Sequence, residues 1–177
     1  MKNLTDKSKY LSLLLRHKPE LANLELKEDG WVDVHTLIKN TDFTLSELKE
    51  IVSTDKKQRY SFDSTYTCIR ANQGHSVNVK MNFKEFIPIK ELYHGTSINV
   101  KDIIFKEGIK KQSRQYVHLS QDIETAKKVG ERHGKPFIFI IDAVKMYEDG
   151  IKFYISENNV VLTDFVNKKY LKAFNNY

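Results

Sequence analysis

Short helical patterns separated by turns occupy the first part of the chain. Apolar residues recur at helical spacing over 10–15 (YLSLLL), and Pro19 limits how far that helix can continue. A turn at 29–30 (DG) precedes a second, short amphipathic pattern, VHTLIKN. Thr44 and Glu47 have the spacing of a capping box before LKEIV, which predicts the start of a third helix.

Strand-like patterns follow these helices. The runs RYSFD and YTCIRA flank a polar turn at 63–65, which predicts a β-hairpin. Helices followed by a hairpin are the element order of a winged helix. That fold usually binds nucleic acid, although a fold alone does not establish function.

The pattern changes between residues 80 and 90, after which strands dominate. ELYHGT predicts a strand that ends in a polar turn, and Ser97 can begin a helix that Gly108 stops. YVHLS predicts a short strand, and Asp122 can cap the helix IETAKKVGERH. FIFIIDA predicts a buried strand, with FYIS and NNVVLTDF as further strands. We therefore expect an α+β protein with two lobes, 1–85 and 86–177.

Composition narrows the class of protein. The chain has 177 residues, of which 40% are hydrophobic, so each lobe can have a core of its own. Cys68 is the sole cysteine, which excludes an internal disulfide and a cysteine-based metal site. The histidines show no metal-ligand spacing, and we expect no metal. We find no signal sequence, membrane-length apolar run or surplus apolar face, so we expect a cytoplasmic monomer.

The net charge of +6 gives polyanions only a modest advantage as partners, because a lysine-rich proteome would also produce it. More informative are basic side chains that lie in or beside apolar patterns, where a charge is unfavourable. Taken singly, each has a structural explanation, such as a cation at a helix C-terminus. Brought together, they would form a pocket for a phosphate group. These residues are Arg16, His17, Arg59 and Arg114.

A polar segment follows the second predicted strand of the hairpin. Its backbone N–H groups, beside a glycine, suit anion binding, but an ordinary connecting loop explains it equally well. The segment consists of Asn72, Gln73, Gly74, His75 and Ser76.

Two histidines are predicted at strand ends in the second lobe. Such positions suit hydrogen bonds to ribose hydroxyls and an amide, although isolated histidines are more often structural. The two motifs are His94, Gly95 and Thr96, and His118 with Ser120. Neither a GxGxxG nor a GxxxxGK[ST] motif occurs, which argues against a Rossmann or P-loop site, and no acidic cluster indicates a two-metal phosphatase.

Together these motifs resemble the RNA 2′-phosphotransferase family, the KptA proteins of bacteria and their tRNA-splicing relatives. The resemblance covers almost the whole chain and rests on the joint order of LSLLLRHKP, DGWVDVHTLI, DKKQRYSF, IRANQGHSV, LYHGT, SRQYVHLS, VGERHGKPFIFIIDA and DGIKFYISENNVVLTDFV. It implies an N-terminal winged-helix lobe that binds RNA and a C-terminal lobe with the ADP-ribosyltransferase fold that binds NAD⁺.

The resemblance also implies a reaction and roles for residues. An RNA 2′-phosphate attacks NAD⁺ and expels nicotinamide, and a second step releases 2′-hydroxyl RNA and ADP-ribose 1″,2″-cyclic phosphate. The family's catalytic set falls on Arg16, His17, Arg59 and Arg114, which would surround one phosphate. Residues 94–96, His118 and Ser120 would hold NAD⁺, and residues 72–76 would contact RNA phosphates.

One departure separates the chain from ADP-ribosyltransferases that modify proteins. Those enzymes usually carry a catalytic glutamate where this chain reads NNVVLT, and an ionised phosphate needs no such base. Two alternatives stay open: ADP-ribosylation of nucleic-acid terminal phosphates, and a winged-helix regulator without catalytic activity.

Overall fold

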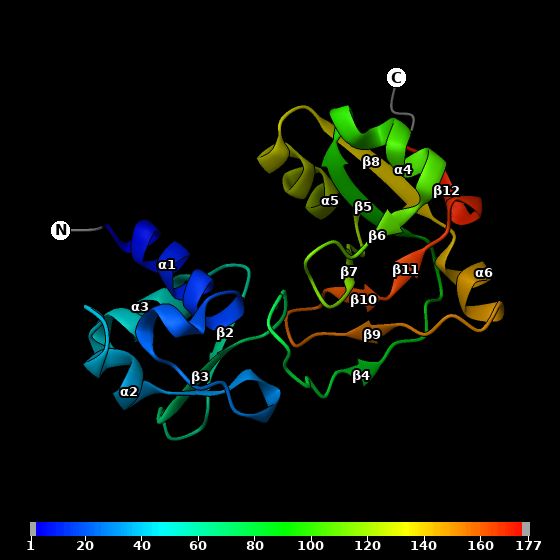
Figure 1. Cartoon of the computed structure of the whole chain (residues 1–177). Helices are drawn as coiled ribbons and strands as arrows, with labels where there is room; N and C mark the ends of the chain where they lie inside the picture. The colour runs from blue at the N-terminus through cyan, green and yellow to red at the C-terminus, as the bar shows by residue number, and fades with distance from the viewer. Residues whose placement is uncertain (1–2, 175–177) are drawn as a thin grey trace. The chain divides into compact units, whose positions relative to one another are not determined.

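The computed structural model describes residues 3–174 and has an α+β fold (Figure 1). The chain forms two compact units, Met1–Asn82 and Phe83–Tyr177, where we had placed the division at 85/86. Each unit contains its own cluster of buried hydrophobic residues. No helix within residues 3–174 has the length and apolar character needed to cross a bilayer.

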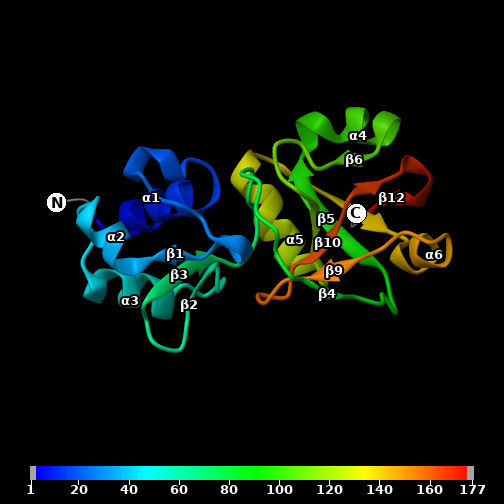
Figure 2. The same cartoon turned by 60° about the horizontal axis from the view of Figure 1, so that its bottom comes forward.

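The first unit combines helices with a small antiparallel sheet. Its strands lie in the order β1-β3-β2, as Figure 2 shows, and the turn between β2 and β3 confirms the predicted hairpin. The elements are α1 (Leu4–Arg16), β1 (Val32–Asp33), α2 (Val34–Lys39), α3 (Leu45–Thr54), β2 (Tyr60–Phe62) and β3 (Cys68–Ala71).

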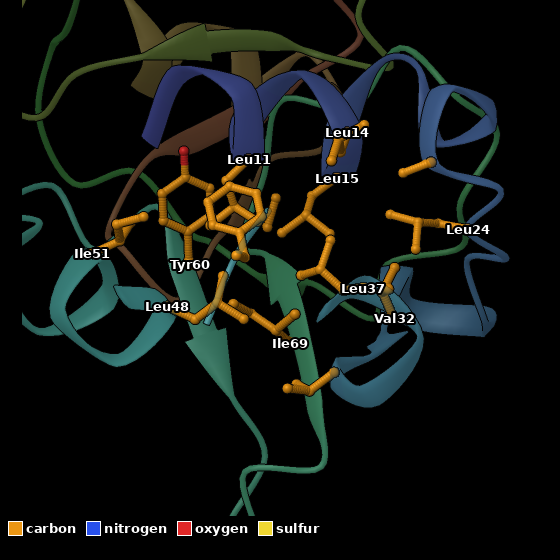
Figure 3. Packing of buried hydrophobic residues seen from close by; sticks show 14 residues of the cluster. Leu11, Leu14, Leu15, Leu24, Val32, Leu37, Leu48, Ile51, Tyr60 and Ile69 are labelled. Atoms are coloured by element: carbon orange, nitrogen blue, oxygen red, sulfur yellow. The ribbon is translucent and has the colours of Figure 1, made fainter. Parts of the chain in front are cut away.

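The apolar face of α1 forms the centre of this unit's core. Leu11, Leu14 and Leu15 are fully buried and point from α1 toward the sheet and the other helices (Figure 3). Leu37 and Ile69 meet them from α2 and β3. Burial of each such side chain contributes about 1.5–3 kcal/mol, so the leucine spacing read from the sequence accounts for how α1 is held.

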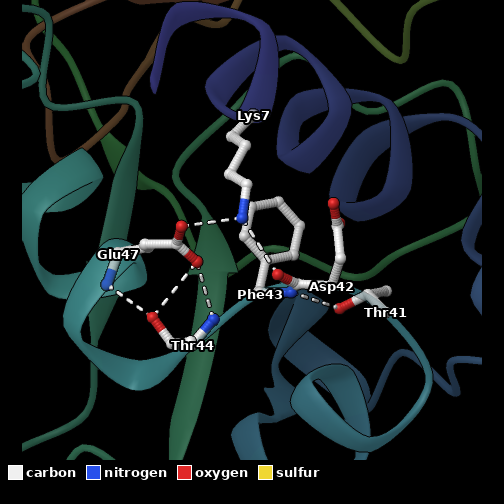
Figure 4. A network of polar contacts seen from close by, with 6 residues as sticks. All are labelled: Lys7, Thr41, Asp42, Phe43, Thr44 and Glu47. Atoms are coloured by element: carbon white, nitrogen blue, oxygen red, sulfur yellow. Dashed lines mark hydrogen bonds and ion pairs between the residues drawn. The ribbon is translucent and has the colours of Figure 1, made fainter. Parts of the chain in front are cut away.

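A polar network fixes the start of α3 against α1. Thr44 and Glu47 form the predicted capping box, in which each side chain bonds the other residue's backbone N–H (Figure 4). The Lys7 ammonium donates to Glu47 at 2.7 Å and to the Asp42 carbonyl at 2.9 Å. The helix start is therefore tied both locally and across the unit.

The second unit contains nine of the twelve strands found in residues 3–174. They form the sheets β4-β9-β10-β7, β12-β8-β5 and β11-β6. The strands are β4 (Lys84–Glu85), β5 (Leu92–Ser97), β6 (Ile109–Lys110), β7 (Val117–Leu119), β8 (Pro136–Ile141), β9 (Tyr154–Ile155), β10 (Val161–Thr163), β11 (Phe165–Val166) and β12 (Leu171–Ala173). The helices are α4 (Lys101–Glu107), α5 (Ile123–Gly130) and α6 (Ala143–Glu148).

Helix α5 packs directly on β5 and β8 (Figure 1). Its predicted cap is confirmed, because the Asp122 side chain accepts from the Thr125 N–H at 2.7 Å. Gly95 of β5 faces the helix so closely that a Cβ atom there would overlap the Ala126 carbonyl oxygen. The close seat of α5 therefore requires glycine at this position.

Strand β5 corrects one prediction. We expected a polar turn at HGT, but β5 pairs with β8 without interruption from Leu92 opposite Ile141 to Ser97 opposite Pro136. His94 thus lies inside a strand, so the prediction that it marks a strand end is wrong, whereas His118 lies one residue before the end of β7. Backbone pairing with the apolar strand β8 therefore keeps the polar residues of β5 in strand conformation.

Candidate active site

The polar segment 72–76 is the point where distant parts of the first unit meet. At its start, the Asn72 N–H donates to the Arg59 carbonyl at 2.8 Å. At its end, the Ser76 N–H donates to the Arg16 carbonyl at 2.9 Å, and the Val77 N–H does so at 3.3 Å. One loop therefore links the end of α1, with Arg16 and His17, to Arg59 at the start of β2.

Arg16 is a buried cation at the last turn of α1. The residue is only 9% exposed, so it is not a solvated cap. Its Nη1 donates to Ser12 Oγ at 3.3 Å, and its guanidinium carbon lies 5.8 Å from the centre of the Tyr60 ring. Gly74, with φ = 87°, brings the loop backbone against this guanidinium, and a Cβ there would lie 3.6 Å from Cζ. The surroundings hold the guanidinium in place.

His17 caps α1 and touches the other end of the loop. Its Nδ1 lies 2.9 Å from Ser76 Oγ. Ser76 is exposed, and this contact lies at the surface. The imidazole is therefore oriented by a hydroxyl and stays accessible to a ligand. This is the arrangement that a histidine needs to bind a phosphate or to move a proton.

Arg59 precedes β2 and is partly accessible. Its side chain is 35% exposed and forms an ion pair with Asp55 at 3.1 Å. Asn72 supports the same turn, since its Nδ2 donates to the Gln58 carbonyl at 2.7 Å. Asn72 itself is 2% exposed, so its contacts lie within the protein.

His75 is the buried histidine of the loop 72–76. It is 2% exposed, and its Nε2 has no hydrogen-bond partner within residues 3–174. Burial, followed by the positive charges of Arg16, His17 and Arg70, lowers the pKa of His75 to about 4. His75 is therefore neutral at physiological pH. Gln73 is half-buried and Ser76 exposed, so these two are the most accessible members of the loop 72–76.

A second group of predicted residues gathers in the second unit. His94 Nδ1 lies 3.1 Å from the His118 carbonyl oxygen, which can only accept, so Nδ1 carries the proton. Burial lowers the pKa of His94, which keeps the ring neutral and leaves its Nε2 as an acceptor. The structure thus joins the two predicted histidine motifs through neighbouring strands.

Arg114 orients the second histidine. Its Nη1 lies 3.2 Å from His118 Nδ1, and because a guanidinium only donates, Nδ1 is the acceptor and Nε2 carries the proton. Ser120 continues this edge, pairing with Tyr93 through N–H···O bonds of 2.8 and 2.9 Å. The two histidines therefore carry their ring protons on different nitrogens, Nδ1 in His94 and Nε2 in His118.

The remaining predicted residues lie on β5. His94 and Thr96 share the strand face that carries the buried Leu92, whereas Gly95 faces α5. The residue type at Gly95 is thus explained by helix packing, and its contact with a cofactor stays a prediction. No group of three or more His, Cys, Asp or Glu side chains that could hold a metal ion is found among residues 3–174.

The structure brings the predicted residues together in two sets, one within each unit. Arg16, His17 and Arg59 meet at the loop 72–76, while Arg114 belongs to the second unit, so the expectation that all four surround one phosphate stays a prediction. Asp55, which lies in the run DKKQRYSF, is not among the residues predicted from the sequence, although it forms an ion pair with Arg59. The signal was its spacing of four residues from Arg59 directly after a helix end.

Comparison with known proteins defines the class. The family model described as "RNA 2'-phosphotransferase, Tpt1 / KptA family" matches residues 2–165. The chain therefore belongs to this family.

Curated bacterial relatives agree along nearly their whole length. A protein of Flavobacterium johnsoniae is 49% identical over 170 residues, covering 93% of both chains. One of Fusobacterium nucleatum is 49% identical over 172 residues, covering 93% of this chain and 95% of its own. One of Escherichia coli O9:H4 is 44% identical over 177 residues, covering 97% and 96%. Each is named "Probable RNA 2'-phosphotransferase".

Proposed function

We propose that this protein removes an internal 2′-phosphate from RNA with NAD⁺ as co-substrate. The family membership supports the reaction class. The observation that carries the proposal is the loop 72–76, which bonds the backbone carbonyls of Arg16 and Arg59 and the His17 side chain. In this proposal the first unit is a winged-helix lobe that binds RNA, and the second is an ADP-ribosyltransferase-like lobe that binds NAD⁺.

The proposed reaction has two steps. A 2′-phosphate oxygen attacks C1″ of the nicotinamide ribose, and nicotinamide leaves with the electron pair of the glycosidic bond. The ribose 2″-hydroxyl then attacks the phosphorus, the bond from phosphorus to the RNA 2′-oxygen breaks, and that oxygen takes up a proton. The products are nicotinamide, 2′-hydroxyl RNA and ADP-ribose 1″,2″-cyclic phosphate.

The cations of the first unit suit the phosphate. A phosphate monoester carries nearly two negative charges, and an arginine fork binds its oxygens in a fixed geometry. The buried Arg16 and the partly exposed Arg59 are both held by protein contacts, so they need little reorganisation as charge builds up on the phosphate oxygens. Arg114 is proposed as a further ligand of the same phosphate.

The histidines have two proposed roles, one in the chemistry of the phosphate and one in binding NAD⁺. His17, accessible and bonded to Ser76, is the proposed group for proton movement or phosphate binding in the second step. His94 and His118 are proposed to contact the nicotinamide ribose, because neighbouring segments bring them together and the neutral His94 ring keeps Nε2 as an acceptor. Thr96 and Ser120 complete the proposed NAD⁺ contacts, and Gln73 and Ser76 are proposed to reach the RNA.

The test is the reaction of RNA carrying one internal 2′-phosphate with NAD⁺, for the wild-type protein and for His17→Ala. The wild type should release ADP-ribose cyclic phosphate, and His17→Ala should accumulate 2′-phospho-ADP-ribosylated RNA. Stable ADP-ribosylated ends on terminal phosphates, without the cyclic product, would support the terminal-phosphate alternative. Sequence-specific duplex binding without any NAD⁺ turnover would support the regulator.

A further inference from the structure

A tight turn connects the end of α3 to the start of β2, and Arg59 is its last residue. Asp55 is the C-cap of α3, and its carbonyl accepts from the Gln58 N–H at 2.8 Å. Gln58 adopts the left-handed conformation, with φ = 45°, which reverses the chain. The turn that leads to Arg59 therefore spans five residues, 55–59.

The Asp55 carboxylate holds Arg59 at two points. Oδ1 pairs with Arg59 Nη2 at 3.1 Å, and Oδ2 accepts from the Arg59 backbone N–H at 2.7 Å. The same carboxylate accepts from the Lys57 N–H at 3.2 Å. One side chain therefore fixes both the main chain and the guanidinium of Arg59.

The location of this carboxylate is unfavourable for the helix alone. A negative charge at a helix C-terminus opposes the helix dipole, and the Asp55 side chain is only 6% exposed, so water screens it little. The contacts with Arg59 account for an aspartate here, whereas helix stability does not.

Asn72 secures the same turn from the other side. Its N–H and its Nδ2 bond the carbonyls of Arg59 and Gln58. The backbone of the turn thus has a support that does not depend on Asp55. The direction of the guanidinium does depend on Asp55, because the ion pair is the contact that joins its Nη2 to the protein.

We propose that Asp55 is a positioning residue, which aims the Arg59 guanidinium at the phosphate for the second step. This inference rests on the proposed function. Among residues 3–174 the ion pair joins one carboxylate oxygen to Nη2, and Nε is buried without a partner, so Nη1 and the second N–H of Nη2 are left for phosphate oxygens. Fixing the side chain in advance avoids the loss of rotamer freedom when the phosphate is bound.

The charge of Asp55 makes the inference testable. Asp55→Asn keeps an oxygen that can accept from the backbone but removes the negative charge beside Arg59. The site becomes more positive, so RNA with a 2′-phosphate should bind as tightly as before or more tightly. The second step should nevertheless slow by about 10- to 100-fold, because the guanidinium is no longer held in line with the phosphate.

The experiment measures both steps by single-turnover assay with 2′-phosphorylated RNA and NAD⁺. The proposal expects accumulation of the ADP-ribosylated intermediate in Asp55→Asn, an unchanged or lower KM for RNA, and no further effect of Asp55→Asn in an Arg59→Ala background. Asp63→Asn is the matched control. Asp63 also holds a turn beside β2, but its bonds go to Cys68, Thr65 and Thr67.

If Asp55→Asn slows both reaction steps equally and lowers the melting temperature, the role of Asp55 is merely structural. If the second step of Asp55→Asn runs at the wild-type rate, the proposal is overturned. A wild-type protein that forms no cyclic product would instead refute the proposed function. Nitrogen NMR of the Arg59 guanidinium separates these cases without turnover, since slow rotation in the wild type and fast rotation in Asp55→Asn are expected from the ion pair alone. Equally fast rotation in both would also overturn the proposal.

Discussion

His75 is the residue whose ionisation the fold constrains most clearly. Its folded pKa is about 4, below the ordinary value of 6.5, because the ring is buried next to Arg16, His17 and Arg70. In the unfolded chain the ring takes up a proton below its ordinary pKa, whereas the folded protein does so only near the depressed one. Acidification through this window therefore favours the unfolded state.

We predict that the free energy of unfolding falls by about 3 kcal/mol from His75 alone between about pH 7 and pH 4. The measurement is urea denaturation across this range for the wild type and His75→Gln, which has no titrating ring. The stability difference between the two should shrink or reverse as the pH falls. A constant difference would show that His75 titrates alike in both states. Asp63 and Asp149, with pKa values of about 2, act mainly at lower pH.

At this scale the sequence predicts which residues carry charge but not what holds them. Arg16 looks like an ordinary helix end in the sequence, and its burial follows only from contacts with Tyr60 and Gly74. These contacts join positions that are more than 40 residues apart along the chain. The partner of Arg59 is local, at Asp55, and so was within reach of sequence reasoning.

Elements that carry a local chemical signal were predicted well. The capping box at Thr44, the cap at Asp122 and the helix stop at Gly108 all appear in the structure. The sequence predicts too short a strand at β5, because the run HGT (94–96) resembles a polar turn. Its strand conformation comes from pairing with β8, which no local pattern reveals. The sequence does not predict helix α6, because the apolar run FIFIIDA indicates a strand that extends to Ala143, the first residue of the helix.

Helix α5 packs closely on strand β5 at Gly95. Gly95→Ala places a methyl group against the Ala126 carbonyl, a rigid backbone atom, so helix and strand must separate. We expect a loss of about 3 kcal/mol or more in the free energy of unfolding, measured by denaturant titration. Gly130→Ala is the control, since its Cβ would lie 2.9 Å from the Thr96 carbonyl and should cost less. Wild-type stability of Gly95→Ala would contradict this packing.

At the scale of the whole molecule, the chain divides its apolar residues between two cores. Leu14 belongs to the cluster of the first unit and Phe153 to that of the second, and both are fully buried. The proposed division of labour, with RNA bound by one unit and NAD⁺ by the other, requires each unit to keep its own binding surface in order. Separate cores provide this, because contacts within each unit maintain its own set of site residues.

This arrangement predicts that core substitutions act mainly within their own unit. Leu14→Ala and Phe153→Ala each remove a buried side chain and leave a cavity, at a cost of about 2–5 kcal/mol. In hydrogen exchange followed by mass spectrometry, Leu14→Ala should lower protection chiefly within Met1–Asn82, and Phe153→Ala chiefly within Phe83–Tyr177. Each variant serves as the control for the other. Equal loss of protection throughout the chain in both would show instead that the two units unfold as one cooperative body.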